Sequence, residues 1–272
     1  MDDRPIGMFD SGFGGLTVAR ALIDLLPAEH LVYVGDTARY PYGPRPLDEV
    51  REFAREIATH LVERFEVKLL IVACNTAAAA ALEVLQDGLA IPVVGVIEPG
   101  VRAAVSATRR GRVGVIGTVG TMASGAYQRA FEVANQAIPM NEIDLVCAAC
   151  PGFVEFVERD ETTGDQVHVL AERLLAPIRE AKVDTLLLGC THYPFLARTI
   201  SDVVGRDVVL VSSADETAFE VRSLLMATAF ARDPGTGPGS HRFLSSGDGE
   251  WFRQLGRRLL GPELDVVEAV QW

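Results

Sequence analysis

The chain alternates short apolar runs with longer amphipathic segments, and this alternation constrains its fold more than any other feature. Strand-length apolar runs separated by segments of helical periodicity are typical of parallel sheets whose strands are connected by helices. We predict strands over residues 6–9, 31–35, 69–73, 93–96, 113–116, 143–146, 185–188, 208–211 and 242–244. We predict helices over residues 16–25, 47–65, 76–85, 125–135, 163–181, 215–231 and 249–260. The predicted fold class is therefore α/β with mainly parallel sheets.

The sequence also contains an internal repeat. Residues 67–76 resemble residues 183–192, because each segment is an apolar run followed by a small residue, a cysteine and polar residues. A second matched pair, residues 6–12 and 113–118, precedes them in the same order. The two halves of the chain therefore look like two copies of one strand–helix arrangement.

This repeat predicts two pseudo-symmetric, doubly wound lobes. We assign residues 1–97 and 209–272 to the first lobe and residues 98–208 to the second. Ligands of open α/β sheets bind beyond the carboxyl ends of the strands, where the repeated cysteines stand. We therefore expect Cys74 and Cys190 to face each other across one cleft between the lobes, which would hold the active site.

Charge and hydropathy exclude several classes of partner. The net charge of -12 argues against nucleic acid, because phosphate backbones are bound by basic surfaces. No apolar stretch reaches the roughly 18 residues of a membrane span. The first residues lack the basic and apolar regions of a secretory signal, and four cysteines without such a signal suggest reduced thiols. We expect a cytoplasmic protein with no membrane partner.

The sequence gives little support for a cofactor or a metal. Its two lysines, Lys68 and Lys182, each stand just before a predicted strand, although pyridoxal phosphate needs a lysine in the site for its Schiff base. Cys147 and Cys150 form a single Cys-x-x-Cys pair, which two thiols at the edge of the core explain better than a zinc site. We predict neither a cofactor nor a metal.

Paired cysteines suit the inversion of a carbon centre. Racemisation removes an α-proton from one face and returns a proton to the other, so two opposed acid/base groups are natural. A thiol has an ordinary pKa of about 8.5, which its surroundings can lower towards neutral pH. His192 follows Cys190 closely, and Asp10 ends the matching strand of the Cys74 half. Asp10 could instead simply cap the helix that follows it.

Several motifs at the predicted strand ends carry a resemblance to a known family. In chain order they are Phe9-Asp10-Ser11-Gly12 with Gly14-Gly15-Leu16, Gly35-Asp36-Thr37, Pro41-Tyr42-Gly43, Ala73-Cys74-Asn75-Thr76, Gly117-Thr118 with Thr121, and Leu188-Gly189-Cys190-Thr191-His192-Tyr193-Pro194. They resemble those of the glutamate racemases, within the aspartate/glutamate racemase superfamily. The resemblance extends from residue 6 to Leu260-Gly261, which is nearly the whole chain.

The resemblance implies roles for particular residues. Cys74 would take the proton from D-glutamate and Cys190 from L-glutamate. The assisting acidic or basic residues would be Asp10 for Cys74, His192 and Glu158 for Cys190, and Asp36 as a further acid. Glu158 is identified because residues 150–158 match the family pattern Cys-Pro-x-Phe-Val-x-x-Val-Glu. Contacts with L- or D-glutamate would come from Asp10, Ser11, Pro41, Tyr42, Gly43, Asn75, Thr76, Thr118, Thr121, Thr191 and His192.

The resemblance further implies a cofactor-independent racemase that supplies D-glutamate for peptidoglycan, and we expect a homodimer. Two other functions stay open from the residues alone. A sister racemase could act on aspartate or hydantoins, since pocket shape sets that choice. A solute-binding protein also has two α/β lobes around a cleft, although the paired strand-end cysteines count against it.

Overall fold

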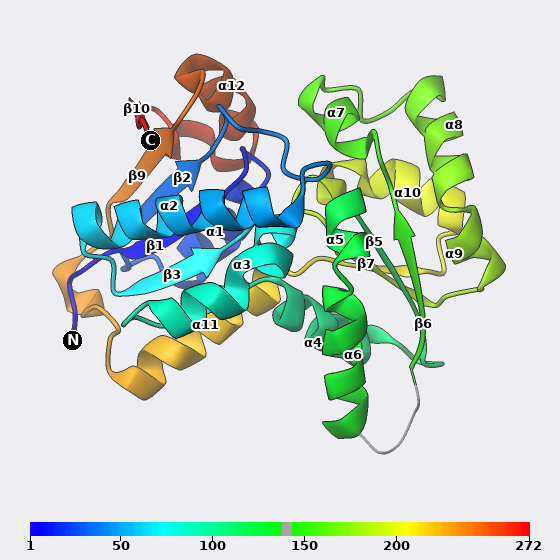
Figure 1. Cartoon of the computed structure of the whole chain (residues 1–272), viewed down its shortest axis with the longest axis horizontal. Helices are drawn as coiled ribbons and strands as arrows, with labels where there is room; N and C mark the ends of the chain where they lie inside the picture. The colour runs from blue at the N-terminus through cyan, green and yellow to red at the C-terminus, as the bar shows by residue number, and fades with distance from the viewer. Residues whose placement is uncertain (138–142) are drawn as a thin grey trace. The chain divides into compact units, whose positions relative to one another are not determined.

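A computed structural model describes residues 1–137 and 143–272 of the chain (Figure 1). The chain divides into two compact units. The first comprises Met1–Val96 and Ala214–Trp272, and the second comprises Ile97–Ser213. The sequence places a boundary at residue 209, ahead of the strand at 209–211, whereas the first unit resumes at Ala214 because that strand pairs within the second sheet.

The first unit contains a six-stranded sheet with the order β10-β9-β2-β1-β3-β4. Neighbouring strands of this sheet pair in parallel. The strands are β1 (Ile6–Asp10), β2 (Leu31–Gly35), β3 (Leu69–Val72), β4 (Val93–Gly95), β9 (His241–Ser245) and β10 (Val267–Ala269). All residues of β1, β2 and β3 are buried, because helices cover both faces, and this explains their continuous apolar sequences.

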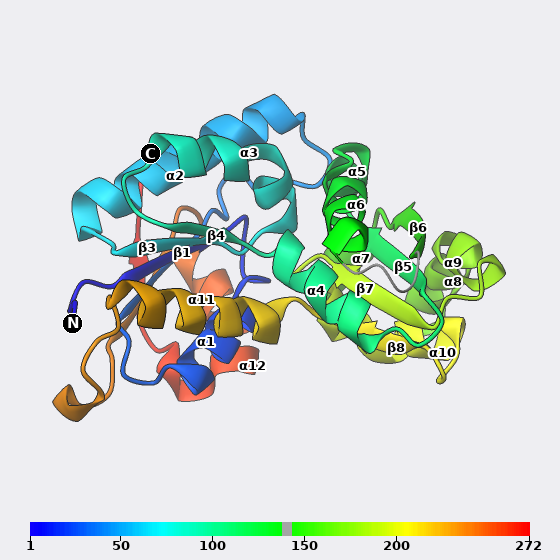
Figure 2. The same cartoon turned by 90° about the horizontal axis from the view of Figure 1, so that it is seen from below.

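Helices cover this sheet in two layers (Figure 2). On one face α2 packs against α3, and on the other α1 packs against α11 and α12. The helices and short 3-10 turns of the unit are α1 (Leu16–Leu25), α2 (Leu47–Phe65), α3 (Asn75–Gly88), α11 (Ala214–Thr228), η2 (Pro234–Thr236), α12 (Gly249–Leu260) and η3 (Gly261–Glu263). The side chain of Asp248 caps α12 by accepting the N–H groups of Glu250 and Trp251.

The second unit contains a four-stranded parallel sheet with the order β6-β5-β7-β8. Its strands are β5 (Arg112–Gly117), β6 (Asp144–Ala149), β7 (Thr185–Gly189) and β8 (Val209–Val211). Its helices and 3-10 turn are α4 (Ile97–Ala107), α5 (Val119–Ala123), α6 (Ala126–Ala137), α7 (Phe153–Glu158), α8 (Asp165–Leu174), α9 (Ala176–Glu180), η1 (Tyr193–Leu196) and α10 (Ala197–Val204). Here α4 packs against α6, and α8 packs against α10.

The two sheets repeat one strand order. The run β2-β1-β3-β4 of the first sheet corresponds to β6-β5-β7-β8 of the second. In both, the strand that leads into a cysteine, β3 or β7, pairs with the strand that opens the repeat, β1 or β5. The predicted α/β class with two pseudo-symmetric parallel sheets is therefore confirmed.

The helix predicted over residues 163–181 is wrong as one continuous element. It is two helices, α8 and α9, which meet at Leu175. Pro177 stands in the first turn of α9, where its missing N–H is tolerated, but a continuous helix would leave the carbonyl of Arg173 unbonded and against the proline ring. The helices α4, α5, α7 and α10 and the strand β10 were not predicted, because each is short or begins in a Pro- or Gly-containing segment.

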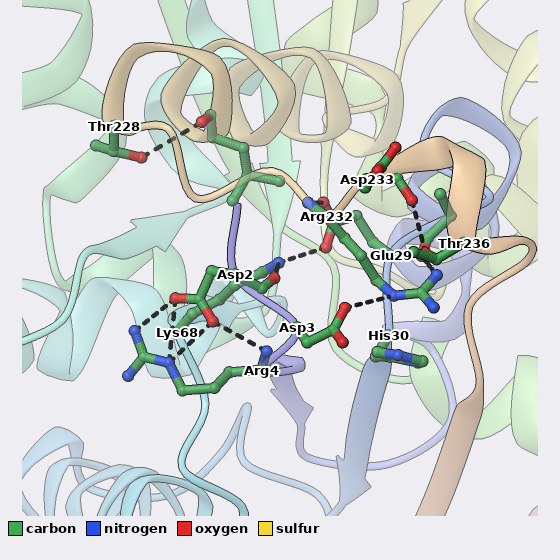
Figure 3. Close-up of polar contacts among 12 residues, drawn as sticks. Asp2, Asp3, Arg4, Glu29, His30, Lys68, Thr228, Arg232, Asp233 and Thr236 are labelled. Atoms are coloured by element: carbon green, nitrogen blue, oxygen red, sulfur yellow. Dashed lines mark hydrogen bonds and ion pairs between the residues drawn. The ribbon is translucent and has the colours of Figure 1, made fainter.

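Lys68 stands just before β3, and Figure 3 draws it among its polar neighbours. Its Nζ donates to Glu29 Oε2 at 2.6 Å and to the carbonyl oxygen of Asp2 at 2.7 Å. The second oxygen of Glu29 accepts the backbone N–H of Arg232 at 2.8 Å. This buried ion pair fastens the amino-terminal segment and the chain after α11 to the base of β3, at the opposite end of that strand from Cys74.

Within residues 1–137 and 143–272, no helix is long and apolar enough to cross a membrane.

Candidate active site

Cys74 lies between β3 and α3 in the first unit. It is the N-cap residue of α3, a helix of 14 residues, and its side chain is buried. The thiol donates a hydrogen bond to Ser11 Oγ at 3.7 Å. A helix N-terminus carries partial positive charge and therefore favours a negative group placed there. The local backbone thus suits the thiolate form of Cys74.

Asp10 and Ser11 follow β1, the strand that pairs with β3. The buried carboxylate of Asp10 accepts the backbone N–H of Gly12 at 2.8 Å, so it shapes the turn that leads into α1. Gly15 closes this turn, and a Cβ there would lie 2.5 Å from the Cβ of Asp10. Only glycine fits this close approach, which explains the glycine at position 15.

Asn75 and Thr76 form the first turn of α3, directly after Cys74. Both side chains are buried, although neither belongs to the apolar core. The first backbone N–H groups of a helix have no partner within it, so this turn offers donors beside the thiol. The predicted residues Asp10, Ser11, Cys74, Asn75 and Thr76 therefore stand together at the carboxyl ends of β1 and β3.

Asp36 follows β2 and is fully buried. One carboxylate oxygen accepts hydrogen bonds from the hydroxyl of Tyr42 and from Arg39 Nε, the latter at 2.7 Å. The other accepts from Ser246 Oγ at 2.6 Å and from Trp272 Nε1 at 3.0 Å. Four donors fill the acceptor sites of this carboxylate, so Asp36 is suited to holding other groups in place rather than to accepting a substrate proton.

Tyr42 belongs to the predicted segment Pro41-Tyr42-Gly43 and is buried against the ring of Phe53. Burial, the carboxylate of Asp36 and, to a smaller extent, Cys74 raise the pKa of Tyr42 far above its ordinary value. Tyr42 is therefore protonated at any physiological pH and acts as a hydrogen-bond donor to Asp36.

Cys190 follows β7 in the second unit and is buried. Its sulfur lies 3.9 Å from His192 Nδ1, and His192 Nε2 lies 2.8 Å from Glu158 Oε1. His192 opens the 3-10 turn η1, whereas Glu158 ends α7. The second oxygen of Glu158 is buried and has no hydrogen-bond partner among the described residues. The three side chains form a line from thiol to imidazole to carboxylate.

The charge of His192 follows from this line. Burial by itself lowers the pKa of His192, but hydrogen bonds and charge interactions with Cys190 and Glu158 outweigh it and raise the pKa to about 10. His192 is therefore a cation at neutral pH, held between two groups that can carry negative charge. The predicted grouping of Cys190, His192 and Glu158 is present in the structure.

The remaining predicted residues of the second unit are threonines near the same strand ends. Thr118 follows β5 and caps α5: its hydroxyl accepts the N–H of Thr121 at 3.2 Å, and the two hydroxyls are 2.9 Å apart. Thr191 separates Cys190 from His192, and its hydroxyl lies 3.5 Å from His192 Nδ1. Since β5 pairs in parallel with β7, these hydroxyls and Cys190 all lie at the carboxyl ends of the strands of the second sheet.

Cys147 and Cys150 differ from the two strand-end cysteines. Burial raises the pKa of Cys147 to about 11, and burial together with Cys190 raises that of Cys150 to about 12. Both are free thiols and are protonated at neutral pH. In the part of the chain that the structure describes, no cluster of His, Cys, Asp or Glu could hold a metal ion.

The hydrogen-bond partners of Asp36 were not predicted from the sequence. Arg39 lies three residues after Asp36 in the sequence. This spacing is only a weak indication that the two side chains interact. Ser246 and Trp272 reach Asp36 from segments more than 200 residues later, and no local pattern indicates such contacts. Tyr33 was likewise expected only as a strand residue, yet its hydroxyl donates to the carbonyl of Gly12 at 3.0 Å, beside Asp10.

Comparison with known proteins gives consistent matches over the whole chain. The family model of Asp/Glu/hydantoin racemases matches residues 6–220. A glutamate racemase of Parafrankia sp. (strain EAN1pec) is 53% identical over 267 residues, which cover 98% of this chain and 94% of the relative.

Two crystal structures show the same architecture. A glutamate racemase isoform from Bacillus anthracis superposes with a TM-score of 0.90 at 40% identity, covering 100% of this chain and 98% of that one. A glutamate racemase from Francisella tularensis subsp. tularensis SCHU S4, solved in complex with D-glutamate, has a TM-score of 0.89 at 34% identity, with coverage of 100% and 98%.

Proposed function

The chain belongs to the Asp/Glu/hydantoin racemase family, and from this premise we propose that it is a glutamate racemase that uses two cysteines and no cofactor. As a member of this family it is a racemase, and hence an isomerase. We propose glutamate as the substrate because relatives that are 53% identical over 98% of this chain carry the name glutamate racemase. One of the similar crystal structures contains D-glutamate.

One observation carries the proposed mechanism. Cys74 and Cys190 follow β3 and β7, which occupy the same position in the repeated strand order of the two sheets. Ligands of such sheets bind at the carboxyl ends of the strands. Two sheets that present matching thiols at these ends supply one acid/base group for each face of an α-carbon.

In this mechanism one cysteine is a thiolate and the other a thiol when substrate binds. The thiolate removes the α-proton from one face of glutamate, and the electron pair moves towards the α-carboxylate. The opposite thiol then delivers its proton to the other face, which inverts the carbon. After each turnover the first cysteine is a thiol and the second is a thiolate. This is the protonation state from which the reverse reaction begins.

Each cysteine has its own assisting groups. Cys74 acts on D-glutamate with Asp10 beside it, whereas Cys190 acts on L-glutamate with His192 and Glu158. The ionic line from Glu158 to Cys190, with distances of 2.8 and 3.9 Å through His192, supports the second assignment. We assign substrate contacts to Asp10, Ser11, Pro41, Tyr42, Gly43, Asn75, Thr76, Thr118, Thr121, Thr191 and His192.

The assignment of Asp36 is narrower than the sequence suggests. Its two oxygens already accept four hydrogen bonds. We therefore assign it to positioning Tyr42 rather than to proton transfer. The domain assignment, with residues 1–97 and 209–272 in one lobe and residues 98–208 in the other, is also part of the proposal.

The cellular role follows from the product. D-glutamate produced by this reaction would supply peptidoglycan synthesis. The mechanism needs both thiols reduced, which agrees with a reducing compartment such as the cytoplasm. A homodimer stays a prediction.

Deuterium exchange tests the proposed function directly. The protein is incubated in deuterated water with L-glutamate and separately with D-glutamate, without added cofactor. Optical rotation and α-deuterium content are followed, and aspartate is run in parallel. We expect loss of rotation and incorporation of deuterium with both glutamate enantiomers. Absence of exchange with glutamate would refute the assignment, and exchange with aspartate alone would transfer it to that substrate.

A further inference from the structure

The Asp36 carboxylate joins three segments of the first unit that are far apart in the sequence. Asp36 itself begins the loop between β2 and α2, Ser246 lies between β9 and α12, and Trp272 follows β10. Ser246 and Trp272 donate to one oxygen of Asp36, while Tyr42 and Arg39 donate to the other. Tyr42 is therefore connected to Trp272 through a single buried carboxylate.

Trp272 is held firmly on this carboxylate. The guanidinium of Arg39 lies over its ring at 5.0 Å from the centroid, and the ring of His60 packs edge-on with centroids 5.5 Å apart. Arg39 is itself fixed by Asp36, by Glu56 at 2.5 Å and by the ring of Phe53 at 4.2 Å. The indole N–H is thus aimed at Asp36 by contacts on both its face and its edge.

The loops around the carboxylate are joined in the same way. Thr37 Oγ1 lies 2.7 Å from Ser245 Oγ and accepts the N–H of Gly247 at 2.9 Å. A Cβ on Gly247 would lie 2.7 Å from that threonine oxygen, so glycine is needed for the approach. The segment after β9 therefore fixes the start of the loop that carries Tyr42.

We propose that Trp272 and Ser246 are positioning residues for the substrate segment Pro41-Tyr42-Gly43, and that they act through Asp36. Because this inference rests on the proposed function, its effect should appear in the binding of glutamate. Their hydrogen bonds fix the orientation of the carboxylate, and the carboxylate fixes the hydroxyl of Tyr42. Loosening this connection should raise KM more than it lowers kcat, since both residues donate to Asp36 rather than to a cysteine.

The test compares Trp272→Phe with Trp251→Phe, the same change at the other tryptophan of the chain. Trp272→Phe keeps an aromatic ring beside Arg39 and His60 but removes the donor to Asp36. We expect it to raise KM for both enantiomers about fivefold with little change in kcat, because a hydrogen bond to a charged group is lost. Ser246→Ala should act in the same direction. Trp251 packs on the rings of Phe13 and Tyr40. The indole that donates to Asp36 is that of Trp272, so Trp251→Phe should change KM far less than Trp272→Phe.

A double-mutant cycle identifies the route of the effect. Tyr42→Phe removes the donation from the other side of Asp36, so adding Trp272→Phe to it should raise KM no further. Thermal unfolding of each variant separates this from general loosening. An unchanged KM in Trp272→Phe, an equal rise in Trp251→Phe, or full additivity with Tyr42→Phe would overturn the inference. A wild-type protein that fails to racemise glutamate would instead overturn the proposed function, and the inference with it.

Discussion

The surroundings of Cys74 and of Cys190 differ although the two residues occupy matching strand ends. Cys74 starts a helix of 14 residues and bonds to a neutral hydroxyl, that of Ser11. Cys190 is followed by the 3-10 turn η1, which continues directly into α10, and it lies beside His192, a buried cation paired with Glu158. The first thiol therefore has backbone dipoles near it, and the second has a charged side chain.

This difference shows that the strand fixes where a thiol stands, while the segment after the strand decides its electrostatics. A long helix concentrates partial positive charge at its first turn. The helical segment after Cys190 begins with a 3-10 turn, whose hydrogen-bond geometry is poorer, and a histidine supplies positive charge there as well. Two copies of one motif thus place positive charge near the cysteine by different physical means.

Replacing either cysteine should have the largest effect. Cys74→Ser and Cys190→Ser should each reduce racemisation by about three orders of magnitude or more, because a hydroxyl is a far weaker acid than a thiol. α-Deuterium exchange without inversion should survive on one side only: on L-glutamate in Cys74→Ser and on D-glutamate in Cys190→Ser. NMR of the recovered substrate measures both quantities.

Cys147→Ser is the matched control, since Cys147 is a free thiol whose raised pKa keeps it protonated. It should racemise glutamate like the wild type. Near-normal turnover in either strand-end variant would contradict the two-cysteine mechanism. Exchange on the opposite enantiomer would reverse the assignment of the two faces.

Removing the cation beside Cys190 should have the next largest effect. His192→Gln should lower kcat/KM about 100-fold, within the range for loss of an acid/base group. Because the two enantiomers are equally stable, kcat/KM falls equally in both directions, and the asymmetry appears only in exchange. Exchange into L-glutamate should fall more than exchange into D-glutamate. An equal loss in both would show that His192 does not serve Cys190 specifically.

Glu158→Gln should have a smaller effect, with a distinct pH dependence. The variant keeps a hydrogen-bond partner for His192 but removes one of the interactions that raise its pKa to about 10. The stability from a raised histidine pKa is fully present below about pH 6.5 and is lost as pH rises through about 10. The variant should therefore be less stable than the wild type at about pH 6, and the difference should vanish above about pH 10.

Urea unfolding at about pH 6, 8 and 10.5 measures this difference, and we expect turnover at pH 8 to fall about tenfold. Glu155→Gln, on the preceding turn of the same helix, is the control, because the ion pair of His192 at 2.8 Å is with Glu158. A stability difference that does not change with pH would exclude the ionic explanation.

Ser11→Ala should have the smallest effect. The hydrogen bond from the thiol of Cys74 is long and has a neutral acceptor, so its loss should cost about 1 kcal/mol and reduce turnover several-fold. Exchange into D-glutamate should be affected more than exchange into L-glutamate, the reverse of His192→Gln. A loss as large as that of His192→Gln would mean that the hydroxyl is as important to Cys74 as the imidazolium is to Cys190.

Much of the fold could be predicted from the sequence because its signals are local. Each predicted strand overlaps an observed one, since a buried parallel strand is a short run of apolar residues. The prediction of one helix over residues 163–181 was wrong. Its apolar periodicity continues across Pro177, but a helical backbone cannot continue there without losing a hydrogen bond. The helix α4 was missed because Pro99 and Gly100 in its first turns look like a loop.

For the candidate site, the sequence by itself determined that two cysteines follow two matching strands, each with polar residues after it. His192 and Glu158 are 34 residues apart in the sequence, and their pairing was predicted only through a family resemblance. The contact of Asp36 with Trp272 spans 236 residues and had no sequence signal at all. Tertiary structure decided both, because a hydrogen bond depends on where side chains meet in space, whereas periodicity records only which residues each segment buries.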